Sequence, residues 1–506
     1  MKGNCPVRRR SICEGTEQSQ GNTCREIQKQ EGKDLFMKRV IAMLLTGAMV
    51  MSLAACGSTD TTSAETADTK ETASQSTAAA QNTDSTGAAD GEVVEITVQS
   101  WQYALGNYKG FSEDSELTQA IADEFNATHP GIHATVTIMR QEDHYNALKV
   151  DFAAGSAPDV IGIAPGADLE QYKSQLAPMA DYASAEWGEN WQDQFTDASF
   201  TTITLSGDEI YAFPSAMSAS GTIWYNNKLM TENGVAAFPA TWEELTQAAQ
   251  TLRGAKQIPL MFGGKDNWQN YDMFIAILAT INKDLCNDVF SLDAEWTESD
   301  VVKAFSYYQK LFTDGIVQDG ALSTTIYNEG YSQWKDDDGN STIPMIFNGS
   351  WDLGSLKAEN SFYENFSSND IKVATLPSIE GKEGAVLTAP DVAWGINAAS
   401  PNQEAAWEFV KWMCYDMQQS VVDGLGFFSV LKDAPSPTVD LTADYKAAYD
   451  TISAAAASDQ TVGFRSSFYT KINDELFDQL QLLGTGAATP EEAAAAMAEA
   501  AAGISK

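Results

Sequence analysis

The sequence predicts an α/β fold in which parallel strands alternate with helices, beginning near residue 93. "VVEITV" (93–98) and "IHATVTIM" (132–139) alternate apolar and polar residues, as half-buried strands do. "PDVIGIA" (158–164) is an unbroken apolar run, which is typical of a buried parallel strand. Helical spacing separates these strands, and strand–helix–strand–helix–strand order favours a parallel sheet covered by helices. About 410 residues follow residue 92, enough for two domains.

The two helices between the strands are predicted from apolar residues that recur every three or four positions and so share one face. Those of the first helix are Leu117, Ile121 and Phe125, and those of the second are Tyr145, Leu148 and Phe152.

Three later helices are predicted from their first residues. Thr241, Ser400 and Thr489 each stand three positions before a Glu or Gln, the spacing of a capping box. Proline follows Ser400 and Thr489, where it suits the first helical position. The last of these segments, "PEEAAAAMAEAAAGISK", predicts an alanine-rich terminal helix.

Residues 37–55 have the layout of a secretory signal peptide. "MKRVIAMLLTGAMVMSLAA" has a basic start, an apolar middle and small residues at its end. The apolar run is too short for a confident transmembrane helix. Leu53-Ala54-Ala55-Cys56 resembles a bacterial lipobox, so we expect cleavage before Cys56 and lipid on its thiol. The alternative is a plain signal peptide with an incidental cysteine.

The segments on either side of the signal peptide have different compositions. Residues 57–92 are rich in Thr, Ala, Ser and Asp and almost lack large apolar residues, so we expect a disordered tether after the lipid anchor. Residues 1–36 are polar and hold three of the six cysteines. We expect translation to begin at Met37, which makes 1–36 a wrongly assigned upstream extension. A real cytoplasmic extension is the alternative.

The charge of the chain limits its partners. It has 31 basic and 70 acidic residues and a net charge of −39. Such a surface argues against nucleic acid, anionic ligands and lipid faces, and suits an uncharged ligand. Cys286 and Cys414 are the two cysteines of the folded part; they are either paired in a disulfide or separate buried thiols.

Five segments in order resemble extracellular solute-binding proteins of ABC importers (family 1), in the sugar-binding class that includes the maltose-binding protein. They are "FNATHPGIHATV", "AAGSAPDVIGI", "GDEIYAFPSAMSASGTIWYNNKLMTENGVAAFPATWEELTQAAQTL", "IPMIFNGSWDLGSL" and "VAWGINAASPNQEAAWEFVKWM". The resemblance covers nearly all of residues 93–506.

The resemblance implies a two-lobed, periplasmic-binding-protein-like ("Venus flytrap") fold with hinge-linked lobes and a ligand cleft between them. Residues 93–212 and 392–430 would form lobe 1, and residues 213–391 and 431–506 would form lobe 2. A bond between Cys286 and Cys414 would then lock the hinge, so we expect separate thiols.

The function implied is a lipid-anchored extracellular receptor that captures a carbohydrate, expected to be an oligosaccharide, and delivers it to the permease of an ABC transporter. We expect a monomer that needs no cofactor, binds no nucleic acid and meets the membrane only through its lipid. Two alternatives stay open: a surface carbohydrate-active enzyme, and a receptor of the same fold for a peptide or a polyol.

A sugar site needs aromatic rings for the C–H faces and carboxylates, amides and donors for the hydroxyls. Trp351, in the small-residue turn "NGSWDL", is the leading candidate to stack on ligand, with Asp352 accepting hydroxyls. We expect Trp242, Trp407 and Trp412, on helices, to be core residues instead. The full set of predicted ligand contacts is Trp101, Gln102, Trp224, Trp268, Trp351, Asp352, Asp391, Trp394, Arg465 and Tyr469.

Metal and catalytic sites have little support. Pro130 and Gly131 separate His129 from His133, so these two histidines do not share a helical face. "DDDGN" (336–340) fails the EF-hand pattern, because that pattern would put Trp334 and Met345 at ligand positions. No motif indicates a catalytic residue, and no metal ligand is predicted.

Overall fold

A computed structural model describes residues 93–105, 114–203, 209–358 and 360–504. The predicted upstream extension, signal peptide, lipidated Cys56 and tether therefore lie outside the described residues. Within those ranges, none of the helices combines the length and the apolar character that crossing a membrane requires.

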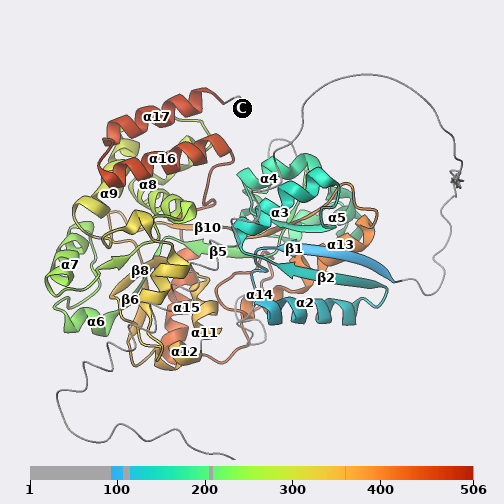
Figure 1. The fold of residues 1–506 in the computed structure, drawn as a ribbon, viewed down its shortest axis with the longest axis horizontal. Coiled ribbons are helices and arrows are strands. Elements are labelled where there is room, and N and C mark those ends of the chain that lie inside the picture. Colours follow the sequence, from blue (N-terminus) through green and yellow to red (C-terminus); the bar gives the residue numbers. More distant parts are fainter. Residues whose placement is uncertain (1–92, 106–113, 204–208, 359, 505–506) are drawn as a thin grey trace, which may run out of the picture. The chain divides into compact units, whose positions relative to one another are not determined.

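A five-stranded sheet organises the first part of the fold, called here the first lobe (Figure 1). Strands β1 (Val94–Ser100), β2 (Ile132–Ile138) and β3 (Val160–Ile163) are parallel, as predicted. Strands β11 (Ala393–Ile396) and β4 (Phe213–Pro214) complete it in antiparallel pairing, in the order β2-β1-β3-β11-β4. A chain segment from beyond residue 390 thus returns to the sheet formed by the first strands.

Helices on this sheet follow the predicted apolar spacing. The helices predicted around Leu117 and Tyr145 are α2 (Asp114–Thr128) and α3 (Gln141–Ala154). Other helices here are α4 (Ala167–Tyr172), α5 (Ala180–Trp187), α13 (Gln403–Lys411), the π-helical turn Trp412–Asp416 and α14 (Gln418–Asp423).

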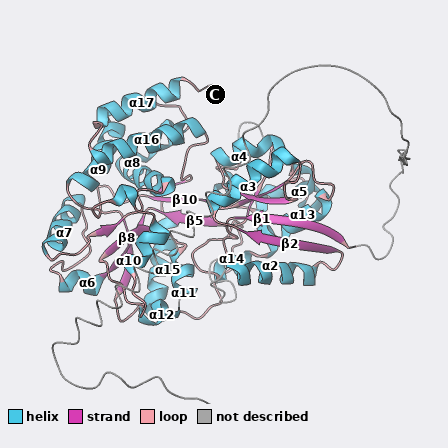
Figure 2. Ribbon diagram, viewed as in Figure 1, coloured by secondary structure: helices cyan, strands magenta, loops and turns pink. Residues whose placement is uncertain are grey.

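A four-stranded sheet in the order β7-β8-β6-β9 organises the second lobe. Its strands are β6 (Thr222–Asn226), β7 (Leu260–Met261), β8 (Met345–Asn348) and β9 (Ile371–Thr375). Figure 2 shows helices around these strands. They are α6 (Asn227–Glu232), α7 (Trp242–Gly254), α8 (Asn267–Phe290), α9 (Ser299–Thr313), α10 (Tyr331–Trp334), α11 (Asp352–Ala358), α12 (Asn360–Asn365) and α15 (Ala443–Ala456).

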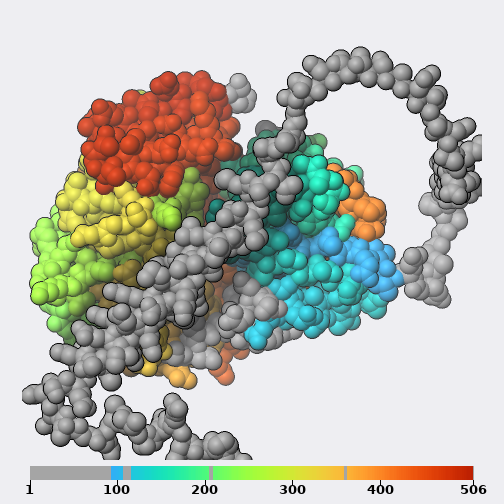
Figure 3. All heavy atoms as spheres, in the orientation of Figure 1, coloured from blue at the N-terminus to red at the C-terminus, as the bar shows by residue number. Residues whose placement is uncertain are grey.

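The chain ends in a helical hairpin on the second lobe. Helices α16 (Thr470–Thr485) and α17 (Pro490–Ala502) pack on each other and on α9, and Figure 3 shows their red surface beside the yellow one. Thr489 forms the predicted capping box with Glu492, and the terminal alanine-rich helix is confirmed.

A three-stranded sheet links the two lobes. Its strands are β5 (Met217–Ser220), β10 (Val386–Pro390) and β12 (Thr461–Val462), in the order β12-β10-β5. Strand β5 continues from β4 of the first sheet and turns at Gly221, whose φ of 86° suits glycine, into β6 of the second. Strand β10 leads back to β11. The predicted two-lobed α/β fold is confirmed; the predicted lobe boundaries stay predictions.

Two of the three predicted helix starts are confirmed. Thr241 and Thr489 accept hydrogen bonds from the backbone N–H of Glu244 and Glu492. The prediction at Ser400 is wrong, because α13 begins at Gln403 and the Ser400 hydroxyl accepts from the backbone N–H of Asn402, at 3.0 Å, rather than from that of Gln403. The same hydroxyl donates to Asp159 Oδ1 at 2.6 Å.

Core packing confirms several predictions. Trp242, Trp407 and Trp412 are buried, with 3–4% of their surface exposed. Cys286 and Cys414 are buried and unpaired, so the structure confirms separate thiols.

His144 of α3 is a buried histidine fixed on both ring nitrogens. Nε2 lies 2.9 Å from the carbonyl of Gly162 and Nδ1 lies 3.1 Å from Nε2 of Gln99. A carbonyl can only accept, so Nε2 carries the proton and Nδ1 accepts from the Gln99 amide. Burial lowers the pKa of His144 to about 4, although the bond to Gly162 opposes that shift.

We predict that His144 makes the first lobe sensitive to acid. The pKa of His144 is lower in the folded protein than in the unfolded chain, where it is about 6.5. The free energy of unfolding therefore decreases as pH falls from about 6.5 towards 4. The full effect is about 3 kcal/mol. Urea unfolding at pH 7 and pH 4.5 should show the parent losing stability relative to H144Q, which is neutral at both values. A pH-independent difference between the two proteins would contradict this assignment.

Candidate functional site

An arginine and two aspartates meet where the three linking strands pass. Arg465, three residues beyond β12, binds Asp272 of α8 through Nε (3.2 Å) and Nη2 (2.7 Å). Its Nη1 lies 3.2 Å from Oδ1 of Asp391, the residue after β10. Ser220 and Ser218 of β5 donate to the two carboxylates, at 2.6 and 2.9 Å. All three linking strands therefore position this ion cluster.

The ion cluster is largely shielded from solvent. The exposed fractions of the side chains are 0% for Asp272, 6% for Asp391 and 21% for Arg465. Burial raises the pKa of Asp272, and the Arg465 guanidinium opposes that shift. Burial also disfavours the charge on Arg465, but Asp272 and Asp391 outweigh it and raise the arginine pKa. Buried charges of this kind persist only where each has partners, because an unpaired one is costly.

Three aromatic rings, called here the aromatic group, adjoin the ion cluster. The Arg465 guanidinium carbon lies 4.6 Å from the ring centre of Trp351 and 5.7 Å from that of Trp268. Trp268 stacks on Tyr327, with centroids 5.9 Å apart and planes at 24°, and meets Trp351 edge-on at 5.6 Å. Tyr327 is 50% exposed, so this pair offers a ring to a ligand.

The first lobe reaches the ion cluster through the residues after β1. The Gln102 side-chain amide donates to Asp391 Oδ2. The neighbouring Trp101 is half-buried, and its ring lies 5.6 Å from His144 and 5.8 Å from Tyr145. Trp101 and Gln102 thus connect the ion cluster with helix α3.

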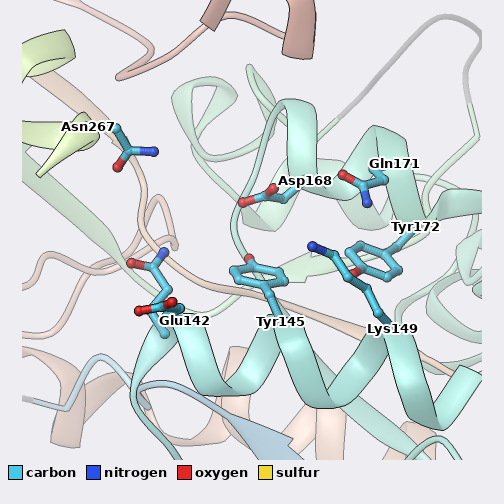
Figure 4. Close-up of a pocket in the computed structure, with 8 residues that line it drawn as sticks. Glu142, Tyr145, Lys149, Asp168, Gln171, Tyr172 and Asn267 are labelled. Atoms are coloured by element: carbon cyan, nitrogen blue, oxygen red, sulfur yellow. The ribbon is translucent and has the colours of Figure 1, made fainter. Parts of the chain in front are cut away.

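A pocket of about 310 Å3 lies between α3 and α4 of the first lobe and the start of α8 in the second (Figure 4). Burial raises the pKa of Asp168, while hydrogen bonding from Tyr145 and the nearby Lys149 oppose the rise. Tyr145 and Tyr172 stack at 6.2 Å. The lining residues are Gln141, Glu142, Tyr145, Lys149, Asp168, Gln171, Tyr172 and Asn267.

The pocket adjoins both the aromatic group and Trp101. Asn267 of the pocket precedes Trp268 in the chain, and Trp101 contacts Tyr145. The aromatic rings can stack on the apolar faces of a ligand. The carboxylates, the amides and the lysine can form hydrogen bonds with its hydroxyls. In the part of the chain that the structure describes, no three His, Cys, Asp or Glu residues are grouped to hold a metal ion.

Two predicted ligand contacts are core residues instead. Trp224 and Trp394 are completely buried. Trp224 is on β6 and its indole faces the Gly349 carbonyl at 3.3 Å, whereas Trp394 on β11 packs against Tyr103. A side chain without solvent-accessible surface offers no face to a ligand, so the structure does not support these two predictions.

The prediction for Asp352 also needs correction. This side chain is fully buried, and its Oδ1 accepts hydrogen bonds from Tyr331 and Asn348. Burial raises the pKa of Asp352 to about 7, against the effect of those hydrogen bonds. It therefore cannot accept sugar hydroxyls in this structure.

Trp351 is less accessible than its place in the turn suggested. It is 9% exposed, its Nε1 donates to Asn348 Oδ1 at 3.0 Å, and Arg465 covers one face. Tyr469 is half-buried against the second-lobe core. The structure brings together Trp101, Gln102, Trp268, Trp351, Asp391 and Arg465, which stay predictions as ligand contacts.

Sequence analysis missed Tyr327, Tyr145 and Asp168. Tyr327 lies in "TTIYNEGY", which becomes a π-helical turn (Ile326–Gly330) and matches no motif. Tyr145 was assigned to the apolar face of a helix, and its ring does pack there while its hydroxyl reaches Asp168. An amphipathic tyrosine satisfies both roles, and periodicity detects only one of them.

The family model for bacterial extracellular solute-binding proteins matches residues 109–419, more than half of the chain. The chain belongs to this family. A maltotriose-binding protein of Pyrococcus abyssi is 24% identical over 337 residues, 63% of this chain and 64% of that protein. An uncharacterised ABC transporter extracellular-binding protein of Pyrococcus horikoshii is 21% identical over 48% of this chain and 50% of its own length. The chain thus spans between half and two thirds of these curated relatives.

Solved structures share the fold over nearly their whole length. A chitin oligosaccharide binding protein superposes with a TM-score of 0.65 at 22% identity, covering 82% of this chain and 100% of that one. A protein from a study of xylan utilisation by Caldanaerobius polysaccharolyticus gives 0.66 at 19% identity, with coverages of 80% and 99%.

The structure predicts different roles for Trp351 and Tyr327. Trp351→Ala should lower the free energy of unfolding of the ligand-free protein by about 3–5 kcal/mol, because it empties a buried, hydrogen-bonded position. Tyr327→Ala, at a half-exposed position, should cost less than about 1 kcal/mol. Urea denaturation of both variants measures this, and equal losses would contradict the assignment.

Proposed function

We propose that this chain is a receptor that captures a carbohydrate, an oligosaccharide, and delivers it to an ABC transporter permease without chemically changing it. The observation that carries the proposal is the stacked pair Trp268–Tyr327, half-exposed beside a carboxylate–guanidinium–amide cluster. Stacked rings suit the apolar faces of a sugar, and fixed polar groups suit its hydroxyls.

The extent of the site supports more than one sugar ring. The aromatic group contributes one binding region and the pocket of about 310 Å3 contributes a second, at the small end of ligand pockets. Trp101 contacts Tyr145 of the pocket. The named relatives support the same class of ligand, because one is a maltotriose-binding protein and another a chitin oligosaccharide binding protein. The charge of −39 favours a neutral ligand over an anionic one.

The proposed receptor is anchored at the outer face of the cell membrane by lipid on Cys56, and residues 57–92 serve as its tether. The receptor would then act as a monomer close to its permease. The family of extracellular solute-binding proteins supports an extracellular place for the folded part.

A panel of neutral saccharides tests the ligand class. We expect at least one of maltotriose, chitotriose, xylotriose and stachyose to raise the melting temperature of the full chain by mass action. The free energy of unfolding should rise by about 2.7 kcal/mol when the saccharide is at a hundredfold excess over Kd. Chromatography after prolonged incubation should show the saccharide unchanged. A panel without stabilisation would contradict the carbohydrate proposal, stabilisation by a peptide or polyol would favour those alternatives, and a hydrolysed product would identify an enzyme.

Replacing Cys56 tests the anchor. Cys56→Ala should release the protein to the medium or leave the signal uncut, whereas the parent stays with the membrane fraction. Mass spectrometry of the parent should find a lipidated N-terminal cysteine. An unmodified mature chain that begins elsewhere would contradict the lipoprotein proposal.

A further inference from the structure

The candidate site is divided between the lobes, and a series of side-chain contacts connects its two parts. Trp268, Tyr327 and Trp351 come from the second lobe, whereas Trp101 and most of the pocket come from the first. Ligand contact with both regions at once requires a fixed register between them. One set of contacts between the regions runs through Arg465, Asp391 and Gln102.

Arg465 is arranged to hold groups of the protein. Its Nε, Nη1 and Nη2 all donate to Asp272 or Asp391, and its flat face lies over Trp351. The fork on Asp272 fixes the plane of the guanidinium, because bidentate pairing constrains orientation as well as distance. That plane in turn supports the tryptophan rings above it.

Asp391 passes the constraint to the first lobe. One carboxylate oxygen, Oδ1, takes Arg465 and Ser218, and the other, Oδ2, takes Gln102. Gln102 follows Trp101, whose ring packs on Tyr145 of the pocket. A movement of Arg465 would therefore change both the rings of the second lobe and the position of Trp101.

We propose that Arg465 is a positioning residue: through Asp391 and Gln102 it holds the aromatic group of the second lobe in register with the pocket of the first. This proposal rests on the proposed function for its effect on ligand, but not for its effect on the lobes. It makes Arg465 an indirect determinant of affinity, in contrast to the direct ligand contact predicted from sequence.

Distances between the lobes test the proposal without any ligand. Spin labels on ketone-bearing residues at the exposed positions 185 of α5 and 250 of α7 leave every cysteine of the full chain in place. Double electron–electron resonance spectroscopy should give a broader or shifted distribution of the distance between the two labels for Gln102→Ala and Arg465→Lys than for the parent. Gln102→Ala removes the connection but leaves the buried Arg465–Asp272 pair whole, so it should fold even if Arg465→Lys does not.

Gln119→Ala is the matched control, since Gln119 is also a first-lobe glutamine that donates to an aspartate, Asp123, at 2.7 Å. It should behave as the parent does. In calorimetry with a saccharide that stabilises the parent, Gln102→Ala should weaken binding about tenfold, as expected for one hydrogen bond to a charged group.

A Gln102→Ala distribution equal to that of Gln119→Ala would overturn the proposal. Weaker binding by Arg465→Lys with unchanged distances would also overturn it, in favour of direct ligand contact. If the distances change but no saccharide binds, the positioning role is supported and the proposed function fails.

Discussion

The buried contact of Arg465 with Asp272 and Asp391 is the interaction on which the arrangement of the site depends. Each charge would be costly alone in this dry environment, so the three side chains constrain one another's positions. Their backbones belong to α8 and to segments just beyond β10 and β12, and Ser218 and Ser220 add β5. A local electrostatic requirement thereby fixes how the linking strands meet the second lobe.

The site follows from that constraint. Once the guanidinium plane is fixed, Trp351 and Trp268 have a support, and Tyr327 can stack on Trp268 with half of its surface open. Gln102 and Trp101 continue the same set of contacts into the first lobe, where Tyr145 and Asp168 line the pocket. A binding site shared between lobes can respond to lobe movement, which is how hinge proteins close on ligands.

The sequence was sufficient for the regular parts of the fold and insufficient for the accessibility of single rings. Periodicity predicted β1, α2, β2, α3 and β3, and local capping chemistry predicted the starts of α7 and α17. The capping prediction at Ser400 failed because its hydroxyl accepts from Asn402 instead of Gln403, while it donates to Asp159, which is distant in the chain. Trp394 and Trp224 were indistinguishable from site residues, because burial depends on packing by other elements. No local sequence pattern indicated Tyr327 as a site residue. Its exposure depends on the π-helical turn Ile326–Gly330 and on how that turn packs against Trp268.

A crystal structure of the full chain with a bound saccharide from the panel tests the central claim most directly. The account predicts a sugar ring against the Trp268–Tyr327 pair, a further ring towards Asp168 and Tyr145, and Arg465 still bonded to both aspartates. A saccharide bound away from those two tyrosines, or an Arg465 that leaves Asp272 to bind the sugar, would contradict it.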